Sequence, residues 1–452
     1  MPQFTSIFSW SLIRHIYTVR TTREEMEREE QRWASTAGFL AACVGSAVGL
    51  GNIWMFPYRA GKYGGGAFLA IYIFLLFIVG VTGLTMEWTL GRSRGGGPIK
   101  SFAVMPFGKY LGVLPTVTMF LILSFYSVVF AWILRFFVGS ISGEIFRESF
   151  LNDIAFQPQS LIFCIIAISI TTLIVMAGVK RGIERANLVM MPLLFVLLII
   201  LAIKSVTLPG AYRGVEFYLM PDLSEMNATT WLMALSQVFF SLSLAGGTMV
   251  VYGSYQSKNR DLTLSSVATS LSDTAVAIIA GLVVIPAVFA FGMEPGEGPE
   301  LIFVTLPKVF ASMRFGWIFA ILFFFTLILA TLSTAISLLE VCVNALCEHL
   351  KWRRKKATFL SALLTMASGS FLSVNENFFE FIVDLSSIYL VILGALMASI
   401  ALMWFYGSKR ARDELNRGGR IKFGRWWEVM GKYVYPAVLI VILLAAALFG
   451  IG

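Results

Sequence analysis

The chain of 452 residues is 58% hydrophobic and only 13% charged, with a mean hydropathy of +0.80. Soluble globular proteins carry about 25% charged residues, so this composition excludes an ordinary soluble protein and indicates a polytopic membrane protein. The net charge of +9 does not indicate nucleic-acid binding, because the basic residues gather in alternate loops between apolar segments.

The first 32 residues are predicted to form a cytoplasmic N-terminal arm. They lack the basic start, apolar core and small-residue cleavage site of a signal peptide. Phe4, Ile7, Phe8 and Leu12 have the spacing of an amphipathic helix lying on the inner leaflet. A disordered leader fits this segment equally well.

A transmembrane helix requires about 20 predominantly apolar residues, and eleven such spans are predicted. They cover residues 34–60, 66–91, 111–142, 158–178, 185–206, 231–256, 262–292, 312–347, 357–374, 379–406 and 433–451.

Most of the 35 Lys and Arg residues fall on one side of the membrane when the N-terminus is placed inside. This bias predicts a cytoplasmic N-terminus, and an odd number of spans places the C-terminus outside. The four cysteines lie in or at the ends of apolar spans, so no disulfide framework is predicted.

The first span contains residues that interrupt a helix: Gly45, Gly49 and Gly51, followed by Asn52 and Pro57. Each glycine costs a helix interior roughly 1 kcal/mol relative to alanine. An unwound turn in a membrane persists only where it lines a buried site, where its carbonyls bind cations and a half-helix N-terminus faces an anion. A glycine-rich packing face is the competing interpretation.

The sixth span has a similar interruption at its centre, with Ser241, Ser243, Gly246 and Gly247. Interrupted spans at the first position of two five-span halves are typical of the binding site in an inverted-repeat transporter. The two segments together therefore favour a transporter.

Two acidic residues lie inside predicted spans. Glu87 is either a functional intramembrane acid or a membrane-end charge paired with Arg92 or Arg94. Asp273 lies about eleven residues into the apolar run of the seventh span, too deep to reach the membrane surface easily. Ionisable residues at such a depth are by default functional.

In the eighth span, Ala330, Ser333 and Thr334 have i, i+3, i+4 spacing, which places their oxygens on one helix face. Such oxygens are ligands for small hard cations, although Ser and Thr also serve as helix–helix contacts. A single tyrosine in an aromatic-rich span, such as Tyr126 at the centre of the third span, is usually a core residue. Asp384 lies near the predicted outer end of the tenth span, where a loop charge is the ordinary interpretation.

Several motifs together resemble one family: GSAVGLGNIWMFPY, GKYGGGAF, GLTMEWTLGR, GVKRGIERAN and QVFFSLSL. They resemble the neurotransmitter:sodium symporters, and the resemblance extends from Trp33 through 416–419 into the last span. Eleven spans and a short loop after the third resemble the prokaryotic amino-acid transporter branch.

The resemblance implies an all-α fold of the leucine-transporter type, with a 5+5 inverted repeat and unwound first and sixth helices. The implied divisions are the arm at 1–32, the first repeat at 33–206, the second repeat at 207–408, and a cytoplasmic loop with span eleven at 409–452.

The resemblance also implies two sodium sites. The second would use three carbonyls and two hydroxyls, from Gly45, Val48, Ala330, Ser333 and Thr334. The first would use the Ala47 carbonyl, Asn52, Ser241 and one side chain of span seven, either Ser272 or the favoured Asp273.

In the same way, the substrate carboxylate would meet the Leu50 and Gly51 amides and the Tyr126 hydroxyl. The substrate amine would meet carbonyls of Ala47, Phe240 and Ser243. The walls of the side-chain pocket would come from Ile122, Tyr126, Phe240, Gly246, Thr334 and Ala335.

Glu87 would brace the unwound turn through hydrogen bonds. Asp384 matches the acid of the outer gate, but Met55 stands where relatives carry arginine, which leaves Arg59 as the candidate substitute.

Trp33 and Glu348 match the inner-gate pattern, with Arg28 or Arg32 as the cationic partner.

The predicted function is a sodium-coupled symporter that imports a neutral, large hydrophobic or aromatic amino acid, because Gly246 and Ala335 replace larger side chains. The alternative is a transport-inactive amino-acid sensor or scaffold on the same fold. The expected partners are the amino acid, sodium ions and the lipid bilayer of a prokaryotic cell membrane. No organic cofactor, nucleic acid or enzymatic activity is expected, and the sequence does not define an oligomeric state.

Overall fold

The computed structural model describes residues 32–147, 150, 153–293 and 301–449. The predicted arm at 1–32 therefore lies almost entirely outside the described residues. In the described part of the chain, helices are joined by turns and loops. This part contains no β-strand, only one isolated bridge between Gly65 and Pro221.

The helices of the first half are α2 (Thr36–Ala47), α3 (Phe56–Lys62), α4 (Gly66–Leu75), α5 (Val81–Arg94), α6 (Pro98–Phe102), α7 (Gly108–Leu111), α8 (Val113–Ser142), α9 (Ser160–Met176), α10 (Arg185–Val206) and α11 (Tyr212–Leu219).

The helices of the second half are α12 (Ala228–Ser241), α13 (Thr248–Ser254), α14 (Leu262–Ala290), α15 (Leu306–Ser312), α16 (Gly316–His349), α17 (Arg354–Leu372), α18 (Glu376–Asp384), α19 (Val391–Ile400), α20 (Ser408–Leu415), α21 (Arg425–Val429) and α22 (Tyr435–Phe449).

Several of these helices continue into one another through π-helical turns. The π turns span Gly51–Met55, Leu76–Gly80, Val179–Glu184, Leu301–Thr305, Leu385–Leu390, Ala401–Gly407 and Met430–Val434, and short 3₁₀ turns span Glu144–Phe146 and Leu223–Glu225.

Seven helices of the described chain are long and apolar enough to cross a membrane, and a bent pair, α2 with Gly51–Lys62, makes an eighth candidate. Each of the eleven predicted ranges overlaps at least one helix. The helices in the ranges 158–178, 231–256 and 357–374 are not among these candidates, so a count of eleven crossings stays a prediction.

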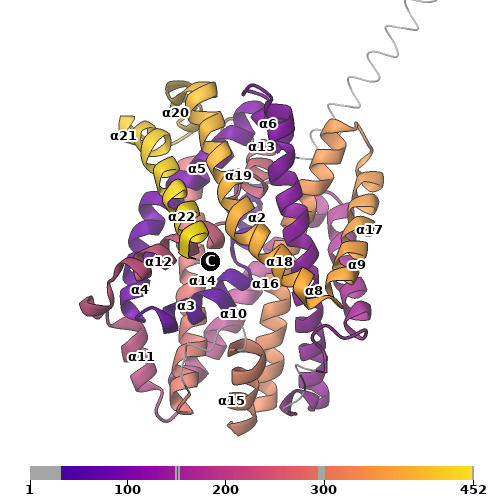
Figure 1. Cartoon of the computed structure of the whole chain (residues 1–452), viewed down its shortest axis with the longest axis vertical. Coiled ribbons are helices and arrows are strands. Elements are labelled where there is room, and N and C mark those ends of the chain that lie inside the picture. Colours follow the sequence, from indigo (N-terminus) through magenta and orange to yellow (C-terminus); the bar gives the residue numbers. More distant parts are fainter. Residues whose placement is uncertain (1–31, 148–149, 151–152, 294–300, 450–452) are drawn as a thin grey trace, which may run out of the picture.

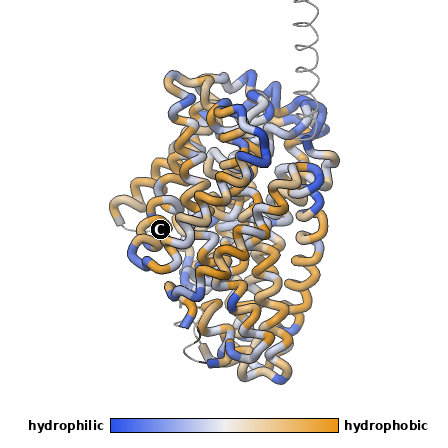
Figure 2. The backbone as a smooth tube through the Cα atoms, turned by 90° about the vertical axis from the view of Figure 1, so that its right-hand side faces the viewer, coloured by the Kyte–Doolittle hydropathy of each residue, from blue (hydrophilic) through white to orange (hydrophobic). Residues whose placement is uncertain are grey.

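The long helix α16 packs against α8, α10 and α2, and α14 packs against α10 and α2 (Figure 1). Figure 2 shows hydrophobic residues along most of the helix length and hydrophilic residues gathered mainly towards the two ends. This distribution is the one expected for a protein whose solvent is lipid around the middle and water at the ends.

Helix α2 stops in the middle of the molecule, where Val48 adopts an extended conformation, and the chain turns by 53° before it continues as 51–62. Helix α12 ends at Ser241, and helix resumes only at Thr248. Between them, Ser243 and Gly246 have φ values of 54° and 66°, which no α-helix allows. Both predicted interruptions are therefore present.

Candidate ion and substrate site

The two interrupted segments contact each other. The Ser243 hydroxyl, in the unwound turn after α12, donates a 2.8 Å hydrogen bond to the Ser46 carbonyl of α2. The residues around both breaks are therefore in contact with each other.

A cluster of oxygens lies on one side of the α2 break, around Asp273 of α14. Asn52 Nδ2 donates to Asp273 Oδ1 at 2.7 Å, and the Ser241 hydroxyl donates to Oδ2 at 2.7 Å. Tyr72 of α4 donates to the same Oδ2 at 3.0 Å. Asn52 Oδ1 accepts a bond from the Gly49 amide at 3.4 Å and has a lone pair left for a further partner.

This geometry distinguishes between the two candidates on span seven. Asp273 is buried and contacts Asn52 and Ser241, whereas the neighbouring Ser272 is half-buried and outside this cluster. Tyr72 was missed by the sequence analysis. It lies in the apolar run of α4, where the sequence does not distinguish a functional tyrosine from an aromatic residue packed in the core.

A second cluster lies on the other side of the break, between α2 and α16. The Thr334 hydroxyl is 3.5 Å from the Gly45 carbonyl and 3.3 Å from the Ala330 carbonyl. The Ser333 hydroxyl donates to the Ala330 carbonyl at 2.8 Å. Because each hydroxyl donates its proton to a backbone carbonyl, the lone pairs of its oxygen remain available to a cation.

The break itself presents backbone amides next to Tyr126 of α8. The Leu50 amide donates to the Tyr126 hydroxyl at 3.3 Å. The ring of Phe240 lies against Gly51, where a Cβ atom would come within 2.8 Å of Cδ1 of the ring. Of the residues predicted to surround a substrate, four are partly exposed and the others are buried; the partly exposed ones are Ile122, Phe240, Ser243 and Thr334.

Gln237 and Arg59 form an unpredicted link between α12 and the first broken span. Gln237 Nε2 donates to the Gly51 carbonyl at 2.9 Å, and Arg59 donates to Gln237 Oε1 at 3.1 Å. Asp384 is exposed, and no ion pair joins it to Arg59 within the described part of the chain. The expected pairing of Arg59 with Asp384 is therefore not found, because the buried guanidinium bonds to α12 instead.

Glu87 supports the second interruption. Its Oε1 atom accepts a hydrogen bond from the Gly246 amide at 2.8 Å. Arg92, its alternative partner, forms an ion pair with Glu414 at 3.0 Å, and among the described residues no ion pair joins Glu87 to Arg94. The geometry agrees with a bracing role rather than with a membrane-end charge.

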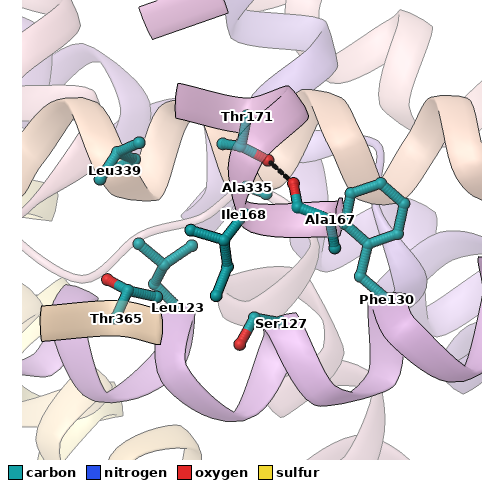
Figure 3. Close-up of a pocket in the computed structure, with 9 residues that line it drawn as sticks. All are labelled: Leu123, Ser127, Phe130, Ala167, Ile168, Thr171, Ala335, Leu339 and Thr365. Atoms are coloured by element: carbon teal, nitrogen blue, oxygen red, sulfur yellow. Dashed lines mark hydrogen bonds between the residues drawn. The ribbon is translucent and has the colours of Figure 1, made fainter. Parts of the chain in front are cut away.

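The two small residues expected to enlarge the pocket, Gly246 and Ala335, lie against other parts of the fold. A Cβ atom on Gly246 would collide with the Gly394 carbonyl of α19 and approach the Phe102 ring to 3.2 Å. Ala335 lines a separate cavity of about 10 Å³ between α8, α9, α16 and α17, with Ser127 and Thr171 on its other walls (Figure 3).

At the expected inner gate, the Trp33 indole donates to the Tyr252 carbonyl at 3.0 Å. Glu348 accepts from the Gly97 amide at 2.9 Å, and no ion pair connects it to the exposed Arg32 in the part of the chain that is described. Arg28 lies outside the described residues. Glu348 is therefore bonded to a backbone amide and not to Arg32, and a pairing with Arg28 stays a prediction.

Two buried carboxylates near Trp33, those of Glu340 and Glu184, make polar contacts that were not predicted. Arg354 pairs with the buried Glu340, with a nitrogen–oxygen distance of 2.5 Å, and Tyr255 donates to the same carboxylate at 2.6 Å. Glu184 accepts hydrogen bonds from the Ser35 amide and hydroxyl at 3.1 and 2.8 Å, at the start of α2.

The model of one protein family, the sodium:neurotransmitter symporter family, matches residues 30–154 and 150–449. The chain belongs to this family. As a sodium:neurotransmitter symporter it is a sodium-dependent transporter and a multi-pass membrane protein, and its leucine-transporter-type all-α fold is confirmed.

The similarity of this symporter to known proteins covers nearly the whole chain. It is 34% identical to the uncharacterized sodium-dependent transporter YhdH of Bacillus subtilis, over 92% of this chain and 98% of the relative. It is 35% identical to an uncharacterized sodium-dependent transporter of Methanocaldococcus jannaschii, over 92% of this chain and 89% of the relative. The crystal structure of MhsT in complex with L-phenylalanine matches with a TM-score of 0.83 and 36% identity, over 92% of this chain and 99% of that chain.

Proposed function

We propose that the protein imports a neutral, large hydrophobic or aromatic amino acid together with sodium, by alternating access. One observation carries the proposal: oxygen clusters lie next to a broken helix whose Leu50 amide donates to the Tyr126 hydroxyl. In this mechanism, two sodium ions and the zwitterionic amino acid bind together in one site from which water is excluded. The proposed orientation has a cytoplasmic N-terminus and an external C-terminus.

The first sodium ion would be held by the Ala47 carbonyl, Asn52, Ser241 and Asp273. The Asp273 carboxylate supplies the negative charge that a desolvated cation requires in a low-dielectric interior. The second ion would be held by the oxygens of Gly45, Val48, Ala330, Ser333 and Thr334, which are hard ligands suited to a hard cation.

The substrate carboxylate would lie against the Leu50 and Gly51 amides and the Tyr126 hydroxyl, and the amine against carbonyls of the unwound turns. Asp273 already accepts three side-chain hydrogen bonds, so it is not free to neutralise a charged substrate side chain. Burial of such a charge without a partner is costly, which favours neutral substrates. MhsT, crystallised with L-phenylalanine, gives the same indication.

Sodium supplies the driving force in this mechanism. Each positive charge that moves inward across a membrane potential gains about 2.3 kcal/mol per 100 mV. Two ions per amino acid would double this gain, and the concentration gradient of sodium adds to it.

The test is uptake of radiolabelled phenylalanine and leucine into proteoliposomes of the purified protein, with and without an inward sodium gradient. We expect accumulation that requires the gradient and is abolished by a sodium ionophore. Excess tryptophan or tyrosine should compete, and glycine, lysine and glutamate should not. Sodium-dependent binding without accumulation would instead identify a sensor, and preference for glycine or a charged amino acid would refute the pocket assignment.

A further inference from the structure

Asn187 of α10 presents a buried oxygen that has no hydrogen-bond partner among the described residues. Its amide nitrogen donates to the Ile183 carbonyl at 2.9 Å. This bond fixes the orientation of the side chain, so that the oxygen is the atom directed away from α10. Buried oxygens left without a partner are rare in proteins, and each is a candidate for contact with an ion or a functional group.

The free oxygen is directed at Gly45 of α2. A Cβ atom on Gly45 would collide with Asn187 Oδ1, and it would also approach Cβ of Ser333 to 3.2 Å. The absence of a side chain at Gly45 is therefore what allows the Asn187 oxygen to reach the backbone of α2. Gly45 and Ser333 both belong to the proposed second sodium site.

A second group lies towards the start of α2: the carboxylate of Glu184, the last residue of the π turn Val179–Glu184 that precedes α10. Glu184 accepts hydrogen bonds from the Ala34 and Ser35 amides at 2.7 and 3.1 Å, and a Cβ on Gly38 would collide with its side chain. Two oxygen-bearing side chains therefore lie along one side of α2. The Asn187 oxygen lies near the break, and the Glu184 carboxylate lies near the first turn. In the proposed orientation the direction from the break to the first turn leads to the cytoplasm.

We propose that Asn187 Oδ1 is a transient ligand of the sodium ion that leaves the second site towards the cytoplasm. This proposal rests on the proposed function. An amide oxygen is a hard ligand suited to a hard cation, and the ion loses its Thr334 and Ala330 ligands as it departs. The unpartnered Asn187 oxygen beside Gly45, whose carbonyl belongs to the same proposed site, then replaces part of the lost coordination before water does.

The experiment compares two transport modes in proteoliposomes, with radiolabelled phenylalanine as the probe. Net uptake requires sodium to leave the protein on the inside. Exchange of labelled for unlabelled phenylalanine, with equal high sodium on both sides, does not require it. Asn187→Leu keeps the branched arrangement of four side-chain heavy atoms but has no oxygen, and Asn187→Asp keeps an oxygen at the same position.

We expect N187L to lower the ratio of net uptake to exchange by about tenfold or more, the range observed for outer-shell partners of metal ligands. N187D should recover part of this ratio. Ser205→Ala is the matched control, since Ser205 is also a buried α10 residue whose hydroxyl is unpartnered among the described residues, and its ratio should not change.

An unchanged ratio in N187L would overturn the proposal. An equal reduction of the ratio in N187D and N187L would also overturn it. So would a variant that loses net uptake, exchange and thermal stability together, since each of these results identifies Asn187 as a packing residue. Absence of sodium-dependent net uptake and exchange in the wild-type protein would instead refute the proposed function, which keeps the two failures distinguishable.

Discussion

A Cβ atom on Gly49 would lie 2.6 Å from the Thr334 hydroxyl oxygen, so the backbone of the α2 break and the side chain of α16 are in direct contact. The same atom would lie 3.0 Å from the Tyr126 hydroxyl. Gly49 therefore allows the proposed second sodium site and the proposed carboxylate site to adjoin with no side chain between them.

Gly49→Ala should impair binding at both sites without unfolding the protein. Overpacking in a tight interior costs about 1–3 kcal/mol, which predicts about a tenfold loss of sodium-dependent phenylalanine binding. Gly424→Ala is the control, because a Cβ there would meet no atom closer than 3.5 Å. Binding titrations with labelled phenylalanine measure the effect, and wild-type affinity in G49A would contradict the contact.

Replacement of both Ser333 and Thr334 by alanine removes two hydroxyl oxygens of the proposed second sodium site. Both hydroxyls donate within α16, to the Ala330 carbonyl, so their loss leaves the helix backbone intact. We expect sodium-dependent uptake to disappear with near-normal membrane insertion.

Thr326→Ala is the matched control, since Thr326 makes the same kind of bond to the Leu322 carbonyl at 2.7 Å. If the double variant retained wild-type sodium dependence, the two hydroxyls would be packing contacts only.

Asp273 should make transport independent of chloride. Its carboxylate contacts Asn52 and Ser241, where it supplies the negative charge that balances the proposed first sodium ion. Uptake should therefore continue when gluconate replaces chloride. Asp273→Asn removes this charge, and we expect it to impair uptake or to make uptake require chloride. Wild-type uptake that vanishes without chloride would exclude this role.

Glu87 is expected to hold the unwound turn in shape through its bond to the Gly246 amide. Glu87→Ala leaves that buried amide unpaired, which costs about 1–3 kcal/mol, whereas Glu87→Gln keeps an acceptor oxygen at the same distance. We expect phenylalanine affinity to fall in E87A and to be largely retained in E87Q. Equal losses in the two variants would show that the charge, and not the hydrogen bond, matters.

Local sequence alone predicted the membrane class, the family and the two helix interruptions. Hydropathy, glycine content and the i, i+3, i+4 spacing of Ala330, Ser333 and Thr334 are properties of short segments. They therefore remain visible in the sequence before any tertiary contact is known.

The partners of the polar side chains were decided only by the tertiary structure. Asp273 rather than Ser272 faces Asn52, Tyr72 completes that cluster, and Arg59 bonds to α12 and not to Asp384. These contacts join residues far apart in the chain, across helices whose relative rotation is set by the packing of whole helix faces. No local periodicity encodes that rotation, so the sequence indicated many of the polar residues, but only the fold determined their partners and added Tyr72 and Gln237.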